Sequence, residues 1–232
     1  MGNLVELAEF HKTDKGFSHY HKHGFSMLYD AFFRGRKDLS FNLLELGILD
    51  GSSLRMWRDY FKNAKIYGLD INPSSMISEE RIFTLCGDQA NSAVLSDVLS
   101  QMDSLPELII DDGCHFQREQ QVSLEYLFPK LKSGGWYVIE DLHSSYHLGW
   151  SDDYSTSTLK LLRCLRDGKD FESDWVSKDF YNHLRESTQE VYIFEKPSSV
   201  FEDLVSRGER VLVPGAERFN CNNSIVSFIK KR

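Results

Sequence analysis

Cysteine is scarce in this sequence, and no two cysteines stand in a C-x-x-C arrangement. The four that occur are scattered along the chain: Cys86, Cys114, Cys164 and Cys221. We therefore expect reduced, mostly buried thiols and a cytoplasmic location.

Long apolar runs and basic blocks are missing as well. No apolar stretch approaches the ~20 residues of a membrane span, and the start MGNLVELAEFHKTDK has no apolar core of signal-peptide length. The formal net charge is −8, from 27 Lys and Arg against 35 Asp and Glu. We expect a protein that is not secreted, has no membrane or nucleic-acid partner, and still can bind a nucleotide or a small sugar.

What the sequence does contain is enough apolar material for an ordinary core. Hydrophobic residues make up 41% and charged residues 27%, which is typical of a soluble globular protein. Residues 1–38 are predicted to form a helical N-terminal appendage or lid, and residues 39–232 the main domain. The aromatic-rich residues 142–188 are predicted to be an insertion that contributes to an acceptor pocket or to contacts in a homo-oligomer.

Short strand-type runs alternate with helical patterns through the middle of the chain. The predicted strands are Asn42–Leu46, Lys65–Asp70, Arg81–Cys86, Glu107–Asp111, Trp136–Glu140, Glu190–Glu195 and Ser224–Lys230. The predicted helices between them are Ser52–Lys62, Asn91–Met102 and Gln117–Leu131, with a short helix and the turn Val213-Pro214-Gly215 before the last strand. This alternation predicts an α/β fold with a doubly wound, mostly parallel seven-stranded sheet and an antiparallel C-terminal edge strand.

Three successive strand ends carry groups suited to a nucleoside. The first strand runs through Glu45, Gly47 and Gly51 into a helix that starts at Ser52. The second ends in Asp70, whose carboxylate suits a ribose diol, and the third is followed by Asp88 and Gln89, which suit an adenine edge.

The turn after the first predicted strand, between Glu45 and Ser52, indicates which nucleoside binds by what it lacks. It has no G-x-G-x-x-G triplet for a dinucleotide, and Glu45 would repel a pyrophosphate. A carboxylate there suits the ammonium and sulfonium of S-adenosylmethionine.

The fourth and fifth strand ends are acidic. Asp111, Asp112 and His115 follow the fourth strand, and Glu140 and Asp141 follow the fifth. Carboxylates this close require a cation, and an oxygen-only donor set favours Mg²⁺, then Mn²⁺ or Ca²⁺. Asp111 can instead be a structural acceptor, which we favour for this residue.

These segments together resemble the metal-dependent sugar O-methyltransferases of macrolide antibiotic biosynthesis, of the mycinamicin and macrocin type, which are class I S-adenosylmethionine-dependent methyltransferases. A cephalosporin-pathway methyltransferase group is more distantly similar. The resemblance spans residues 41–147 and rests on LLELGxxxGSSLRMWRDYF, IYGLDI, GDQ, DDGCH and WYVIEDLHSSY, with a weaker echo in the KTDKG segment at residues 12–16. The sequence departs from the commonest E/D-x-G-x-G-x-G pattern at Leu49, where a glycine is usual.

The resemblance implies an enzyme that uses S-adenosylmethionine and a divalent metal to methylate a hydroxyl of a sugar or glycosylated small molecule, in natural-product or surface-glycan biosynthesis. It implies metal ligation by Asp112, Glu140 and Asp141, and a catalytic role for His115 as general base together with Asp112. It places a further set of residues around the methyl donor: Glu45, Gly47, Gly51, Ser52, Asp70, Asp88, Gln89 and Asp111. Candidate acceptor contacts follow Asp141 directly: His143, Tyr146, His147 and Trp150.

Several alternatives stay open. The same fold can carry a nucleotide-dependent oxidoreductase or epimerase, or a catalytically silent nucleoside-binding module. His115 can line or cap the start of the next helix, and Cys114 most simply fills a tight turn. Residues 12–20 can fold over the cofactor as a lid, and the alternating histidines at 19, 21 and 23 fit a solvated loop better than a metal site.

Overall fold

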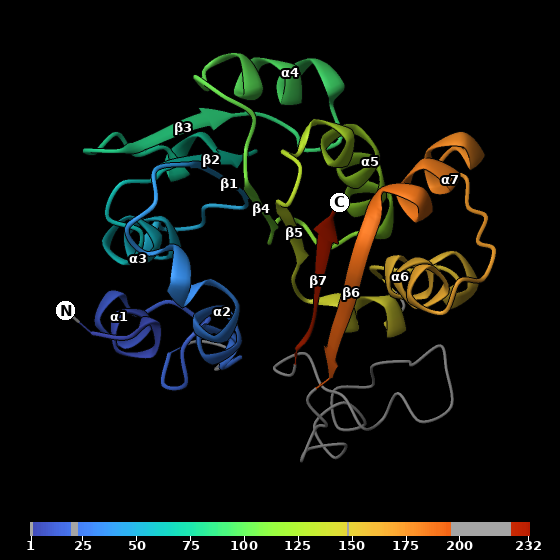
Figure 1. The fold of residues 1–232 in the computed structure, drawn as a ribbon, viewed down its shortest axis with the longest axis horizontal. Coiled ribbons are helices and arrows are strands. Elements are labelled where there is room, and N and C mark those ends of the chain that lie inside the picture. The colour runs from blue at the N-terminus through green and yellow to red at the C-terminus, as the bar shows by residue number, and fades with distance from the viewer. Residues whose placement is uncertain (1, 20–22, 148, 196–223) are drawn as a thin grey trace. The chain divides into compact units, whose positions relative to one another are not determined.

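The computed structural model describes residues 2–19, 23–147, 149–195 and 224–232 (Figure 1). They form two compact units, residues 1–113 and residues 114–232. The predicted turn at 213–215, His21 and Cys221 lie outside the described residues. None of the described helices is both long and apolar enough to cross a lipid bilayer.

The first unit is built on a parallel sheet. Its strands lie in the order β3 (Ile82–Cys86), β2 (Lys65–Asp70), β1 (Asn42–Leu46) and β4 (Leu108–Asp111). Every pairing is parallel, and all five residues of β1 are buried. Because parallel strands need crossovers, helices join them: α3 (Ser52–Tyr60), α4 (Ser92–Ser100) and the short η2 (Pro73–Ser75).

The N-terminal segment is helical, as predicted, and is part of this first unit. It contains α1 (Leu4–His11), α2 (Phe25–Phe33) and η1 (Arg34–Arg36), and α1 packs on both α2 and α3. The Asn3 side chain caps α1 by accepting from the backbone N–H of Glu6 at 3.0 Å. Tyr29 of α2 meets Trp57 of α3 edge to face, with ring centroids 4.9 Å apart. This aromatic contact fixes the N-terminal helices against the first unit's own core.

The second unit contains the antiparallel strands. Its order is β5 (Trp136–Ile139), β7 (Ile225–Lys231) and β6 (Thr188–Glu195). The C-terminal strand β7 is antiparallel to both neighbours and lies between them, so that β6 forms the edge. The helices of this unit are α5 (Gln117–Leu127), η3 (Phe128–Lys130), η4 (Leu142–Tyr146), η5 (Tyr154–Thr156), α6 (Thr158–Arg166) and α7 (Lys178–Ser187).

The observed elements follow the predicted ones closely. Each predicted strand is present, with ends that differ by no more than two residues. The segment 142–188 contains the helices α6 and α7, whose apolar faces are buried. The expectation of mostly buried thiols is wrong for the described cysteines, since Cys86 and Cys114 are exposed and only Cys164 is buried.

Candidate active site

Glu45, near the carboxyl end of β1, is a fully buried carboxylate. One of its oxygens, Oε2, accepts a hydrogen bond from the Ser53 hydroxyl at 2.8 Å. The other, Oε1, is buried and accepts no hydrogen bond from the described residues. Burial raises the pKa of Glu45 to about 7, against the opposing effect of the nearby Lys15 ammonium.

Lys15 brings a cation to the same carboxylate. Its side chain is fully buried, and Nζ lies 3.5 Å from Glu45 Oε1. The same ammonium pairs with Oδ2 of Asp112, just beyond the end of β4. The sequence placed Lys15 in the KTDKG segment that weakly resembles the family, and in the possible lid of residues 12–20, but assigned it no role of its own.

The turn after β1 brings the backbone of Gly47 close to the end of β4. Gly47 has φ 91°, and a Cβ there would lie 2.0 Å from the carbonyl oxygen of Asp112, so that only glycine fits. Leu49, which stands where the commonest pattern has a glycine, has φ 53° and is 69% exposed. Gly51, with φ 80°, ends the turn, and the Ser52 amide that follows donates to Asp50 Oδ1 at 2.9 Å.

Asp70, at the end of β2, holds this turn in place. Its Oδ2 accepts from the backbone N–H of Ile48 at 2.8 Å and of Leu49 at 3.1 Å. Its Oδ1 accepts from the N–H of Asn72 at 2.8 Å. A carboxylate has about four acceptor positions, so that a ribose diol can still donate to one already bound in this way.

Beyond β3, the two predicted adenine-edge residues have different roles in the structure. Asp88 closes a short turn by accepting from the N–H of Ala90 at 2.8 Å. Gln89 is buried and donates from Nε2 to Oδ1 of the fully buried Asp111 at 3.0 Å. This hydrogen bond fits the structural acceptor role that we favoured for Asp111.

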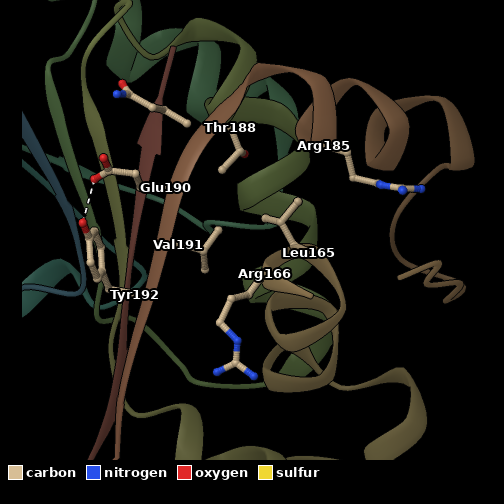
Figure 2. Close-up of a pocket in the computed structure, with 8 residues that line it drawn as sticks. Leu165, Arg166, Arg185, Thr188, Glu190, Val191 and Tyr192 are labelled. Atoms are coloured by element: carbon tan, nitrogen blue, oxygen red, sulfur yellow. Dashed lines mark hydrogen bonds between the residues drawn. The ribbon is translucent and has the colours of Figure 1, made fainter. Parts of the chain in front are cut away.

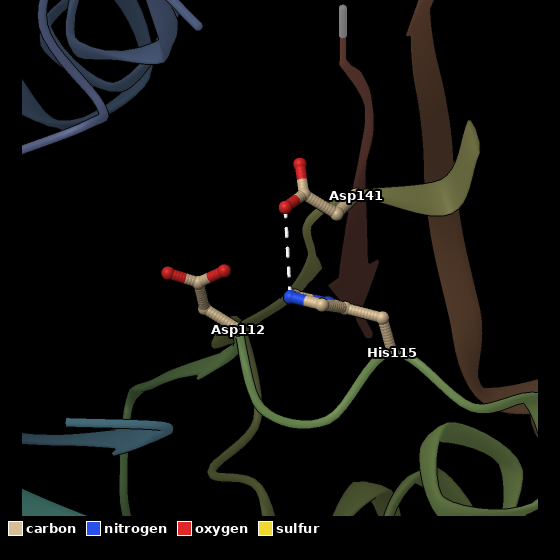
Figure 3. A group of neighbouring side chains, drawn as sticks. All are labelled: Asp112, His115 and Asp141. Atoms are coloured by element: carbon tan, nitrogen blue, oxygen red, sulfur yellow. Dashed lines mark ion pairs between the residues drawn. The ribbon is translucent and has the colours of Figure 1, made fainter. Parts of the chain in front are cut away.

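In the second unit, His115 and Asp141 lie side by side (Figure 3). Nε2 of His115 is 3.5 Å from Oδ2 of Asp141. Both residues adopt left-handed backbone conformations, with φ 61° and 52°. Asp112 belongs to the first unit and precedes His115 by three residues, whereas Glu140, next to Asp141, has a buried side chain.

His115 does not cap α5, and the expectation of a solvated loop is wrong for His23. The N-cap residue of α5 is Phe116, and no side chain caps this helix, so His115 is not its cap. His23 is buried and stacks on Phe25, with ring centroids 5.0 Å apart, and His19 lies 3.9 Å from a carboxylate oxygen of Glu9.

The four candidate acceptor residues differ in exposure. His143, Tyr146 and His147 are buried, while Trp150 is 36% exposed. Tyr146 stacks on Tyr154 with ring centroids 5.3 Å apart, and burial raises the pKa of its hydroxyl to about 12. Trp150 is therefore the most exposed of the four side chains.

Gln117 of α5 fixes the η4 segment that carries these residues. Its side chain accepts from the Ser145 hydroxyl at 2.9 Å and from the N–H of Thr158 at 2.8 Å, and donates to the Ser144 hydroxyl at 3.2 Å. The three bonds join η4 to the starts of α5 and α6 within the second unit.

A separate hollow of about 340 Å³ lies against β6 in the second unit (Figure 2). Its walls come from α6, α7 and β6, and include Leu165, Arg185 and Val191. None of its lining residues belongs to the predicted site, so it is distinct from the acidic and glycine-containing strand ends.

No family model matches the chain. It is 34% identical over 191 residues to 8-demethyl-8-(2-methoxy-alpha-L-rhamnosyl)-tetracenomycin-C 3'-O-methyltransferase of Streptomyces olivaceus, covering 77% of this chain and 47% of that protein. It is 38% identical to demethylmacrocin O-methyltransferase of Streptomyces fradiae, with 65% and 39% covered. It is 36% identical to mycinamicin VI 2''-O-methyltransferase of Micromonospora griseorubida, with 71% and 43% covered. The chain thus spans less than half the length of these relatives.

Two solved structures of the mycinamycin-pathway methyltransferase MycE are similar to this chain. The complex with Mg and SAH has a TM-score of 0.72 at 28% identity, and covers 99% of this chain and 55% of that one. The complex with Mg, SAH and mycinamycin VI has a TM-score of 0.72 at 27% identity, with 99% and 54% covered. The likeness confirms the predicted fold class, a doubly wound, mostly parallel seven-stranded sheet, and the homologues confirm the resemblance inferred from the motifs.

Proposed function

Starting from this homology to sugar O-methyltransferases, we propose that the chain carries an S-adenosylmethionine- and divalent-metal-dependent O-methyltransferase activity. The acceptor is a hydroxyl of a sugar or of a glycosylated small molecule in natural-product or surface-glycan biosynthesis. The observation that carries the proposal is the 33–38% identity to four enzymes named for such reactions. The buried Glu45 carboxylate supports it independently, because a dinucleotide pyrophosphate would be repelled there.

The residues of the first unit fit the methyl donor. Oε1 of Glu45 is a buried acceptor with no hydrogen bond, which suits the ammonium of S-adenosylmethionine. The turn after β1, held by Asp70, keeps the backbone of Gly47 close to the end of β4. We assign the remaining contacts with S-adenosylmethionine to residues at the same strand ends: Gly51, Ser52, Asp88, Gln89 and Asp111.

For the metal we propose Asp112, Glu140 and Asp141 as ligands. Their oxygen donors match the preference of Mg²⁺, with Mn²⁺ or Ca²⁺ as the next choices. Asp112 and Asp141, with His115, are of the residue types that hold such an ion. MycE, which is similar over almost the whole chain, is described in complex with Mg.

His115 is the proposed general base. Its imidazole, 3.5 Å from the Asp141 carboxylate, is oriented by that contact and can take the proton of the acceptor hydroxyl. A bound divalent cation would supply the electrostatic stabilisation that makes a sugar hydroxyl acidic enough to react. The hydroxyl oxygen then forms its bond to the methyl carbon as the sulfonium–carbon bond breaks, and positioning provides much of the rate enhancement.

For the wider organisation we carry the sequence-based expectations forward as proposals. We propose that residues 1–38 act as an appendage or lid on a methyltransferase domain of residues 39–232, and that residues 142–188 line the acceptor site or a subunit contact. Trp150, His143, Tyr146 and His147 are the candidate acceptor contacts. We further propose a cytoplasmic protein, a homo-oligomer, that binds neither nucleic acid nor membrane.

Calorimetry with S-adenosylhomocysteine in the presence of Mg²⁺ tests the donor site, and absence of binding would sink the proposal. Methyl transfer to a panel of glycosides and nucleotide-sugars then tests the activity. A chain that binds the nucleoside but transfers no methyl group to the panel would be a silent binding module. If the chain is instead an oxidoreductase or epimerase, it should bind a nicotinamide dinucleotide.

The metal requirement has its own experiment. Asp112→Ala and Glu140→Ala should each abolish Mg²⁺-stimulated turnover, whereas Asp97→Ala, on the exposed face of α4, should leave it unchanged. Turnover that persists undiminished after treatment with EDTA would refute the metal half of the proposal.

A further inference from the structure

Lys15 lies in a backbone segment that the first unit holds tightly. Thr13 donates from its backbone N–H to the carbonyl of Ala8 at 3.1 Å, at the end of α1. The carbonyl of Lys15 accepts from the N–H of Ser26 at 2.9 Å, at the start of α2, and the adjacent Gly16 carbonyl accepts from Gly24 at 2.9 Å. The segment is therefore tied to both N-terminal helices. These hydrogen bonds fix the position of the backbone from which the buried Lys15 side chain extends.

The side chain of Lys15 extends from this segment to the strand ends of the proposed donor site. Its ammonium contacts Asp112 and lies 3.5 Å from Oε1 of Glu45, with no exposed surface. The desolvation cost of burying an ammonium usually exceeds the attraction of a single carboxylate. A buried lysine therefore needs a second anionic contact or a function. Lys15 has two acidic neighbours and faces the oxygen that we assign to the cofactor's ammonium.

The turn after β1 leaves few donors for the other end of the cofactor's amino acid. S-adenosylmethionine ends in an ammonium and a carboxylate on the same carbon atom, and a buried carboxylate requires N–H donors or a cation. In this turn the backbone N–H groups already donate within the first unit: those of Gly47, Ile48, Leu49, Gly51 and Ser52. Since most N–H groups of this turn are used in this way, a cation close to Glu45 is a suitable partner for a carboxylate there.

We propose that Lys15 binds the carboxylate of the methionine end of S-adenosylmethionine, which makes the N-terminal segment a wall of the cofactor site. The inference rests on the proposed function, because it presumes that the amino-acid end lies at Glu45. The ammonium of the cofactor then meets Glu45 and its carboxylate meets Lys15, so that each charge has an opposite neighbour.

The experiment compares three nucleosides by calorimetry: S-adenosylhomocysteine, its decarboxylated analogue, and 5′-methylthioadenosine, which lacks the whole amino acid. In Lys15→Met, affinity for S-adenosylhomocysteine should fall about 10- to 100-fold, the effect of losing a charge-assisted hydrogen bond. Affinity for 5′-methylthioadenosine, which carries neither charge, should change less than about threefold, and the decarboxylated analogue should lose clearly less affinity than S-adenosylhomocysteine. Lys12→Met is the matched control, since this lysine is exposed in the same segment and should have no effect on any of the three.

Each other outcome overturns the proposal in a recognisable way. Equal losses for S-adenosylhomocysteine and 5′-methylthioadenosine would mean that Lys15 acts on the fold of the site. Tighter S-adenosylhomocysteine binding by the variant would mean that Lys15 competes with the cofactor for Glu45. If the variant does not fold, the unaltered protein still decides: a preference for S-adenosylhomocysteine over its decarboxylated analogue below about threefold overturns the assignment. An unaltered protein that binds none of the three nucleosides refutes the proposed function itself.

Discussion

The ionisation of Glu45 should control cofactor affinity near neutral pH. Burial raises the pKa of this carboxyl to about 7, so that roughly one molecule in ten carries the charge at about pH 6 and roughly three in four at about pH 7.5. If the ammonium of S-adenosylhomocysteine binds only the ionised form, the apparent affinity follows the ionised fraction and tightens roughly eightfold across this interval. The ligand's own ammonium stays protonated throughout, so the change reports on the protein.

Calorimetric titrations at closely spaced pH values, with EDTA present, measure this dependence. Glu45→Gln should remove it and weaken binding at the upper pH by about 1.5–3 kcal/mol, because a neutral amide replaces a charged acceptor. Ser53→Ala is the more delicate test. Its hydroxyl donates to Oε2 at 2.8 Å and lowers the pKa of Glu45, so its loss should move the midpoint to higher pH. A flat profile for the unaltered protein, or an unchanged profile in Glu45→Gln, would refute the reasoning.

Three further changes test the strand ends. Gly47→Ala should lower stability by about 3 kcal/mol or more, roughly a 10 °C lower melting temperature, since its Cβ would meet the Asp112 carbonyl at 2.0 Å. Gly35→Ala, with no atom within 4 Å of its Cβ, is the control and should melt normally. Leu49→Gly should be neutral or stabilise by up to about 1 kcal/mol in chemical denaturation, because it relieves a left-handed φ of 53° at an exposed site; a clear loss would contradict this. His115→Asn keeps a residue that tolerates φ 61° and should cut turnover about 10²- to 10⁴-fold with unchanged S-adenosylhomocysteine affinity; near-normal turnover would exclude it as the base.

The strands and the glycine turn could be predicted because their signals are local. Asn42–Leu46 is an uninterrupted buried run, and the structure gives β1 the same bounds. Asp70 was expected at the end of the second strand for the same reason, since parallel strands present their carboxyl ends at one edge of the sheet. Its hydrogen bonds to the amides of Ile48 and Leu49 were not predictable, because they depend on the conformation of a turn 21 and 22 residues earlier.

The burial and the partners of Lys15 could not be predicted from its neighbours in the sequence. Its burial arises from contacts with Glu45 and Asp112, 30 and 97 residues away, and no local pattern records such distances. The burial of the aromatic segment after β5 could not be predicted for a related reason. Tyr146 and His147 have the residue types of a sugar platform, but the hydrogen bonds of Gln117 draw this segment into the second unit's core, where both side chains are buried.

Of the residues with a strained backbone near these strand ends, some have a proposed chemical role and one has none. Leu49, His115 and Asp141 each come shortly after a strand in the chain and adopt left-handed φ values of 53°, 61° and 52°. A side chain in this region costs on the order of 1–2 kcal/mol, which glycine would avoid. At His115 and Asp141, glycine would also remove the imidazole and carboxylate that the proposed proton transfer requires, so function explains why the strain persists. At Leu49 the exposed side chain has no such role in the proposed chemistry, and relief of strain there should therefore leave both cofactor binding and turnover intact.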